Sequence, residues 1–254
     1  MEPVQPGPID TSVLSEQDNH ISTTIWNGRE PGVYRCIPAN PKKGFWKLND
    51  RQIESVKLTG LHHLSHISHM RIDHSLISAL IERWRPETNI FHFRSGEATI
   101  TLEDVAYIYG LPIDGPPIIG RTYTKRPIIE EVCNSLLGKV PKPTDIEGGQ
   151  LKLTWFHKNF VEAPENASEE DLNRHTRAYL FCLVATQICG FTSGSRGPAY
   201  LLEIFETFKV YAWAPACLAN LYRSLSKATR LKDGIRTICG ALQLLQVNNN
   251  LKDN

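Results

Sequence analysis

The stretch that decides the fold is residues 70–120, which read MRIDHSLISALIERWRPETNIFHFRSGEATITLEDVAYIYGLPIDGPPIIG. Near its start, apolar residues recur at helical spacing, at Ile72, Leu76, Ile77, Leu80, Ile81 and Trp84. This spacing places them on one face of an amphipathic helix over 74–85. Asp73 is a suitable N-cap, and Pro86 ends the helix. We therefore expect this apolar face to lie in the core.

The same stretch continues with a predicted hairpin and a second helix. Residues rich in β-formers flank Ser95-Gly96, which predicts one small β-hairpin near residues 90–102. Thr101 and Asp104 then resemble a capping box, and Gly110 is a typical residue at a helix end. The helix 74–85, the hairpin and the helix 102–109 are expected to form the centre of the structure.

Most of the remaining sequence also predicts helices. The longest apolar run is AYLFCLVATQICGF, within a predicted helix that begins after Ser168 and ends at Gly190. Further helices are predicted around 200–207, 213–229 and 234–247. The sequence shows no alternation of strands and helices typical of a doubly wound sheet. The predicted fold is therefore mainly α, a multi-helix globular domain with one small hairpin.

The overall composition is that of an ordinary globular protein. The chain has 254 residues, of which 41% are hydrophobic and 22% charged, and its net charge is +1. This charge gives no overall attraction to nucleic acid or to acidic membranes. No apolar run approaches the roughly 20 residues of a membrane helix, so we expect no membrane partner. We predict a disordered lead-in over 1–18, one domain over 19–247 and a polar tail over 248–254.

A cluster of histidines precedes the decisive stretch. On a helix, His62, His66 and His69 would lie roughly on one face, and a His-x-x-x-His pair can ligate zinc. A hydrolytic site of this kind also needs a carboxylate base, which residues 63–65 do not supply. Apolar residues between the histidines favour an ordinary surface or core role. A cryptic metal-dependent hydrolase that uses these histidines remains an alternative.

A second candidate site lies on the predicted helix 213–229. Arg223, Lys227 and Arg230 recur at helical spacing and could form a basic face for a nucleic acid or for a partner protein. The alternative is a solvated face whose cations favour the negative end of the helix. The near-neutral net charge supports this second interpretation.

The sequence contains no complete catalytic motif. We find no nucleophile elbow, no P-loop, and neither a candidate Schiff-base lysine nor a phosphate cup for pyridoxal chemistry. Widely spaced cysteines inside apolar helix faces are more typical of core residues than of nucleophiles. We therefore predict a protein that is not an enzyme, with no cofactor and no small-molecule substrate.

Residues 70–120 resemble the core of the plant mobile domain, the family of the maintenance-of-meristems-like proteins. DTSVLSEQDNHISTTIWNG and FWKLNDRQIESVKLTGL resemble the family's lead-in, and RAYLFCLV and YAWAPACLANLYRSLSKATR resemble a later block. The resemblance covers residues 9 to about 247. The chain departs from the family in a short link at 191–210 and in ending with VNNNLKDN, where relatives continue with a tryptophan-rich segment. These departures suit a C-terminally truncated domain, either functional or a transposon-related remnant.

The resemblance, and not the composition, implies a role. It implies a nuclear plant protein that acts in meristem maintenance and in the silencing of transposons and genes. It also implies protein partners, among them a phosphatase of the protein phosphatase 7 type. Direct binding to nucleic acid is the alternative that the basic helix leaves open.

Overall fold

The computed structural model describes residues 12–29, 32–37, 46–67, 70–164, 166–190 and 195–248. Within these residues the chain forms eleven α-helices and eight short strands. The helices are α1 (Ile21–Trp26), α2 (Asp50–Leu58), α3 (His62–Ser65), α4 (His74–Arg83), α5 (Leu102–Tyr109), α6 (Arg126–Leu137), α7 (Leu153–Phe160), α8 (Glu169–Gln187), α9 (Leu201–Ile204), α10 (Trp213–Thr229) and α11 (Leu242–Val247). The strands are β1 (Arg35–Cys36), β2 (Trp84–Arg85), β3 (Ile90–Phe93), β4 (Gly96–Ala98), β5 (Ile146–Glu147), β6 (Gln150–Lys152), β7 (Arg196–Pro198) and β8 (Thr237–Ile238).

The mainly α fold class is confirmed, but the prediction of a single hairpin is too simple. The described residues form three small sheets, with strand orders β1-β8, β2-β3-β4 and β5-β6-β7. The predicted hairpin corresponds to β3 and β4, and it is extended by β2 on one side. The pair β1-β8 is parallel and joins segments from opposite ends of the chain. None of these additional strands exceeds three residues, which is too short to show a strand period in the sequence.

Trp84 accounts for the additional strand β2 beside the predicted hairpin. The predicted helix over 74–85 ends at Arg83, and Trp84 is extended and pairs with Phe91 in the sheet. Pro86 accounts for this early end, since a proline disfavours helical geometry in the residue before it. The indole of Trp84 is fully buried and packs edge-on against Phe91 at a centroid distance of 4.8 Å. Trp84 therefore contributes to the core as predicted, but from a strand.

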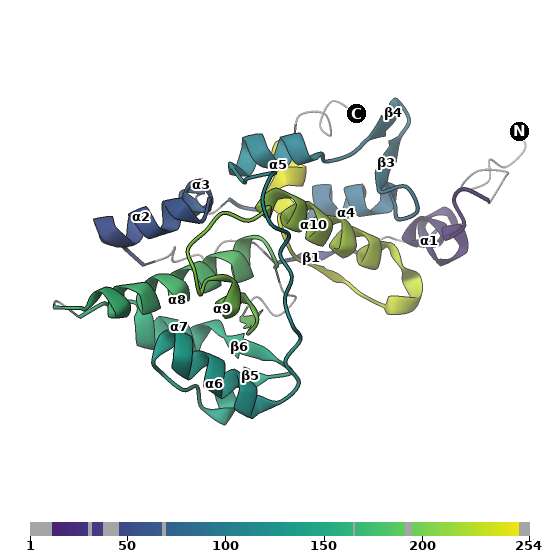
Figure 1. The fold of residues 1–254 in the computed structure, drawn as a ribbon. Coiled ribbons are helices and arrows are strands. Elements are labelled where there is room, and N and C mark those ends of the chain that lie inside the picture. Colours follow the sequence, from purple (N-terminus) through teal and green to yellow (C-terminus); the bar gives the residue numbers. More distant parts are fainter. Residues whose placement is uncertain are drawn as a thin grey trace, which may run out of the picture.

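Helix α8 is the central element of the fold. Figure 1 shows it crossing the middle of the molecule, with α2 on one side and α6 and α7 on the other. All residues from His175 to Ala185 are buried, so the helix is covered around its whole circumference. A helix buried in this way belongs to the interior of a domain. The prediction of a buried core helix is confirmed, as is its N-cap, because the Ser168 side chain accepts a hydrogen bond from Asp171 N.

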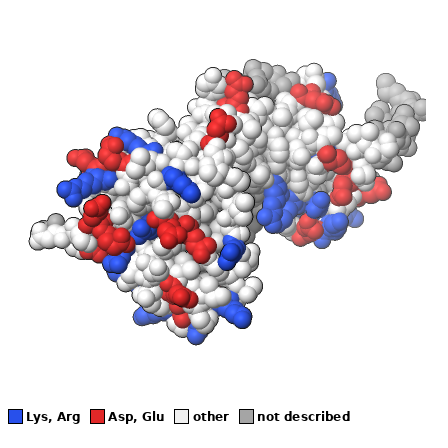
Figure 2. All heavy atoms as spheres, in the orientation of Figure 1, with Lys and Arg blue, Asp and Glu red and all other residues white. Residues whose placement is uncertain are grey.

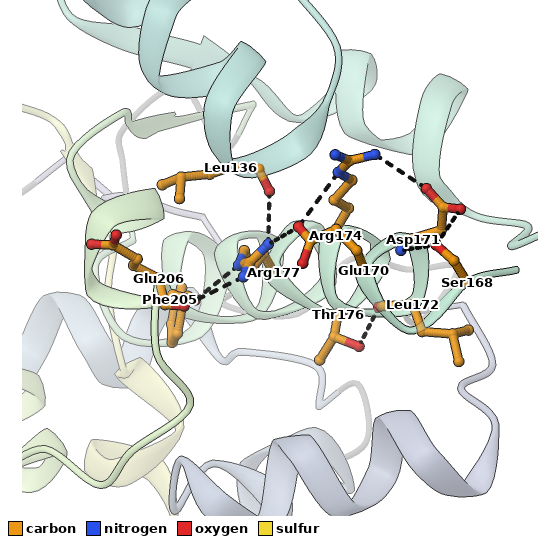
Figure 3. Close-up of polar contacts among 10 residues, drawn as sticks. All are labelled: Leu136, Ser168, Glu170, Asp171, Leu172, Arg174, Thr176, Arg177, Phe205 and Glu206. Carbon is orange, nitrogen blue, oxygen red and sulfur yellow. Dashed lines mark hydrogen bonds and ion pairs between the residues drawn. The ribbon is translucent and has the colours of Figure 1, made fainter.

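One buried arginine on α8 fixes the ends of two other segments. Arg177 donates hydrogen bonds to the carbonyl oxygens of Leu136 (3.1 Å), Phe205 (3.2 Å) and Glu206 (3.4 Å). Figure 3 shows its guanidinium between the end of α6 and the turn after α9, with Glu170 beside it at 3.0 Å. Carbonyls at a helix end lack partners within the helix, so a cation there satisfies them and favours the dipole.

The structure describes only part of the two ends that the predicted division sets apart. Residues 1–11 and 249–254 lie outside the described residues. Within the predicted disordered lead-in, residues 12–18 are described, and Leu14 and Gln17 are buried. The Gln17 side chain accepts a hydrogen bond from Arg85 at 2.6 Å. This part of the lead-in therefore packs on the sheet that β2 begins. Asn248, the first residue of the predicted tail, is also buried.

His20 makes the stability of the domain dependent on pH. Its Nε2 lies 2.7 Å from the carbonyl oxygen of Trp84, while its Nδ1 accepts a hydrogen bond from Ser22 N. Burial lowers the pKa of His20 to about 4, and the nearby Arg85 acts in the same direction. The folded protein thus holds the neutral ring, whereas the unfolded chain binds a proton near pH 6.5. Acid therefore favours unfolding over the window from about pH 6.5 to pH 4.

Because of His20, we expect the free energy of unfolding to fall by about 2 kcal/mol when the pH is lowered from 7.5 to about 5. Urea denaturation at both pH values measures this loss. His20→Gln should show a smaller loss than the wild type, because glutamine does not titrate. An equal loss in both proteins would assign the effect to other groups, such as His157 and His175, whose pKa values burial also lowers.

Candidate functional site

Two of the three predicted basic residues face a cavity. Arg223 and Lys227 are exposed on α10 and line a recess of about 390 Å³. The third, Arg230, caps the end of α10 and lies 3.6 Å from a carboxylate oxygen of Glu16. The structure therefore brings Arg223 and Lys227 together and assigns Arg230 to a separate ion pair. We call the recess the α10 cavity.

The α10 cavity has three walls. One is the end of α8, the second is a face of α10, and the third is the extended chain around β8. Its lining residues are Cys189, Gly190, Asn220, Arg223, Ser224, Lys227, Ile235, Thr237, Ile238 and Cys239. The third wall corrects the predicted helix 234–247, because residues 235–241 are not helical and only α11 forms. The parallel pairing of Cys36 with Ile238 holds this wall in place.

Hydrogen bonds join the walls to one another. The Asn220 side chain donates to the carbonyl oxygens of Ile188 (2.9 Å) and Cys189 (2.7 Å), which end α8. From the opposite wall, the Cys239 thiol lies 2.8 Å from the carbonyl oxygen of Gly190. The polar groups at the end of α8 are thereby satisfied by the protein itself, and the cavity keeps a defined shape.

The wall at the end of α8 and the wall around β8 approach each other closely at Gly190 and Gly240. Gly190 has a φ of +38°, and a Cβ added to it would lie 2.3 Å from the backbone nitrogen of Gly240. Gly190→Ala is expected to lower the free energy of unfolding by about 2–4 kcal/mol, because it adds both backbone strain and a backbone clash. Gly234→Ala is the matched control. Gly234 has a φ of +59°, but a Cβ added there would meet no atom within 4 Å, so only the strain of about 1 kcal/mol should remain. Equal losses in chemical denaturation would show that the glycine contact does not matter.

The cavity is electropositive. No acidic residue is found among its described lining residues, and neither Arg223 nor Lys227 forms an ion pair with the part of the chain that is described. Figure 2 shows basic side chains over the region of α10 and the turn that follows it, with acidic side chains beside them. Burial raises the pKa of Cys189 to about 12 and also raises the pKa of Cys239. Both thiols are therefore neutral near pH 7, and the two cations determine the charge of the cavity.

Only part of the predicted histidine face falls within the described residues. Helix α3 ends at Ser65, so His66 lies beyond it, and His69 lies outside the described residues. His62 and His66 remain neighbours, with ring centroids 4.5 Å apart, and His66 Nδ1 lies 2.9 Å from the carbonyl oxygen of His62. Partial burial and the adjacent His66 lower the pKa of His62. Within the described ranges, no group of three or more histidine, cysteine, aspartate or glutamate side chains could hold a metal ion.

A second recess, of about 610 Å³, lies between α2, α3 and α5. It is lined by Lys57, Gly60, His62, His63, Ala106, Gly110, Leu111 and Pro112. Leu58, 60% exposed, and Tyr107, 81% exposed, follow the lining residues Lys57 and Ala106 in the chain, and Val210, 42% exposed, lies beside Gly60. We call this surface the α2–α5 groove.

Comparison with known proteins now assigns the family. The family model of the plant mobile domain matches residues 60–249, which include the α10 cavity and every lining residue of the α2–α5 groove except Lys57. The chain belongs to the plant mobile domain family. The resemblance noted in residues 70–120 is therefore confirmed. No solved structure matches the chain.

Three relatives from Arabidopsis thaliana are similar to nearly the whole chain. Protein MAIN-LIKE 2 is 46% identical over 95% of this chain and 36% of its own length. Protein MAINTENANCE OF MERISTEMS is 41% identical over 92% of this chain and 49% of its own length. A serine/threonine-protein phosphatase 7 long form homolog is 35% identical over 96% of this chain and 18% of its own length. The chain thus spans about half, or less, of the length of these relatives.

The sequence did not reveal most of the α10 cavity in this plant mobile domain. Arg223 and Lys227 were predicted from their spacing, whereas the polar residues Asn220, Ser224 and Thr237 were not. Asn220 and Ser224 share the helical spacing of the two cations, so the i, i+3, i+4, i+7 pattern could have identified them. Thr237 lies on a strand whose partner is about 200 residues away, and no local pattern indicates that contact.

Proposed function

We propose that this chain is a non-enzymatic protein-interaction module of the nucleus. By analogy with relatives named for meristem maintenance, it acts in meristem organisation and in the silencing of transposons or genes. Its partners are proteins, with a protein phosphatase 7-type protein as the first candidate. The coverage of the relatives carries this proposal. Nearly the whole chain recurs as 18–49% of relatives that carry different names, and one of these is named as a phosphatase.

This distribution supports a module because a unit that recurs in different proteins must contribute something separable from each of them. The α2–α5 groove gives such a module a surface for its partner. Tyr107 stands out from α5, and an exposed tyrosine is typical of the residues that dominate protein interfaces. Leu58 and Val210 are further exposed apolar residues, the first next to Lys57 of the groove and the second beside Gly60.

Co-purification from plant nuclei tests the proposal. We expect a tagged full chain to enrich a protein phosphatase 7-type protein or silencing components, identified by mass spectrometry. Tyr107→Glu should abolish this enrichment, while Val140→Glu should retain it. Val140 is also exposed, at 54%, but follows α6 in another part of the fold. A soluble nuclear chain that enriches no protein above an untagged control would refute the proposal and favour the remnant hypothesis.

Nucleic-acid binding is the second candidate, and the unpaired cations Arg223 and Lys227 favour it. Binding of this kind should weaken steeply with salt, because it releases counterions from the phosphate backbone. Titration of labelled DNA at about 50 and about 200 mM salt separates it from the first candidate.

Within the described residues, no helix is both long and apolar enough to cross a bilayer.

A further inference from the structure

The α10 cavity has the chemistry of an anion site, and the proposed interaction through the α2–α5 groove does not use it. Arg223 and Lys227 stand four residues apart on one face of α10, and the hydroxyls of Ser224 and Thr237 line the same recess. We propose that the α10 cavity binds a phosphate monoester carried on a serine or threonine side chain of a partner protein. This inference rests on the proposed interaction function and names the chemistry that the partner presents.

The charges of the cavity favour a strongly anionic ligand. Cations at i and i+4 on a helix repel one another, and a bound anion between them removes that repulsion. A phosphoryl group carries nearly two negative charges at neutral pH and has three acceptor oxygens. Arginine, lysine and hydroxyl donors are the groups that typically satisfy those oxygens. No carboxylate among the described lining residues opposes its entry.

The shape of the cavity favours a side-chain group over a nucleic-acid backbone. The cations lie beside a recess whose other walls include the buried Ile238 and Cys239, so the anion has to project into it. A nucleic acid needs a row of cations along an open surface. The next cation on α10, Arg230, lies beside Glu16 and does not continue such a row.

The cavity is rigid enough to select a ligand of this size. Asn220 links α10 to the end of α8, and the Gly190–Gly240 contact fixes the opposite wall. Arg223 and Lys227 are exposed and unpaired within the described chain, so their replacement should leave the fold intact. Loss of binding in such variants can therefore be separated from loss of structure.

Titration of the full chain with three matched peptides tests the proposal. The peptides carry phosphoserine, unmodified serine or glutamate at one position, and ¹H–¹⁵N NMR follows the amides of 220–227 together with the Asn220 side-chain amide. We expect saturable shifts with the phosphoserine peptide, weaker binding of the glutamate peptide and none of the serine peptide. Arg223→Ala and Lys227→Ala should each weaken phosphopeptide binding roughly tenfold or more. Arg126→Ala, which removes an exposed arginine paired with Glu130 on α6, should not change it.

Three results would overturn the proposal. The first is that phosphoserine and serine peptides behave alike. The second is that Arg223→Ala and Lys227→Ala bind as tightly as the wild type. The third is that a single-stranded or duplex oligonucleotide shifts the same amides at lower concentration and with a steeper salt dependence, which would assign the cavity to nucleic acid. The proposed function is tested by a different result. It is refuted only if co-purification with the wild-type chain enriches no protein partner.

Discussion

Replacing Arg177 with methionine is expected to lower the free energy of unfolding by about 3–5 kcal/mol. The reason lies in what the guanidinium satisfies, and not in its ion pair. Methionine fills a similar volume but donates no hydrogen bond, so the carbonyl oxygens of Leu136, Phe205 and Glu206 lose a partner together. An unsatisfied buried carbonyl costs about 1–3 kcal/mol, and this applies in full to Phe205, whereas the bonds to Leu136 and Glu206 are only partly buried. The carboxylate of Glu170 contributes less, because its side chain is 51% exposed.

Arg174 provides the matched control on the same helix. It lies one turn before Arg177, is 35% exposed, and contacts Glu170 at 3.5 Å and Asp171 at 3.2 Å. Figure 3 shows both arginines side by side. Arg174→Met should cost less than about 1 kcal/mol, because solvent screens its ion pairs. Thermal and urea denaturation of the two variants measure the difference. Similar small losses would show that water replaces the guanidinium at the ends of α6 and α9.

The starts of α4 and α5 and the extent of α10 were predictable because their signals are local. Asp73 accepts hydrogen bonds from Ser75 N and Leu76 N, as its position before α4 predicts. Thr101 and Asp104 form the reciprocal bonds of a capping box at the start of α5. Each of these contacts spans three residues or fewer. The predicted helix 213–229 coincides with α10 for the same reason.

The small sheets were not predictable, because their partners are distant and their strands are short. β8 falls inside the predicted helix 234–247, yet it pairs with β1 from the beginning of the chain. Ile235, Thr237 and Ile238 are β-branched, which weakly favours a strand, and Gly240 disfavours a continuous helix. In a two-residue strand these preferences are too weak to decide, and tertiary pairing determines the outcome. The α10 cavity depends on this strand, so its cations were predictable and its enclosure was not.

The helical spacing of apolar residues also predicts which side chains of α4 lie in the core. Leu80 lies on the predicted apolar face of α4, and only 3% of it is exposed. Leu80→Asp is therefore expected to lower the free energy of unfolding by roughly 5 kcal/mol or more, because it removes an apolar side chain and buries an unpaired carboxylate.

Ile128→Asp is the control for this substitution. Ile128 is also an aliphatic helix residue, but it is 41% exposed in the first turn of α6, where an acidic residue favours the positive end of the helix. Its free energy of unfolding should change by less than about 0.5 kcal/mol. If Leu80→Asp prevents folding altogether, Ile81→Ala gives a measurable substitute at a fully buried neighbour, with an expected loss of about 2–5 kcal/mol. If Leu80→Asp and Ile81→Ala both melt at the same temperature as the wild type, the placement of α4 in the core is contradicted. Because α4 packs directly on α10, such a result would also contradict the arrangement that supports the α10 cavity.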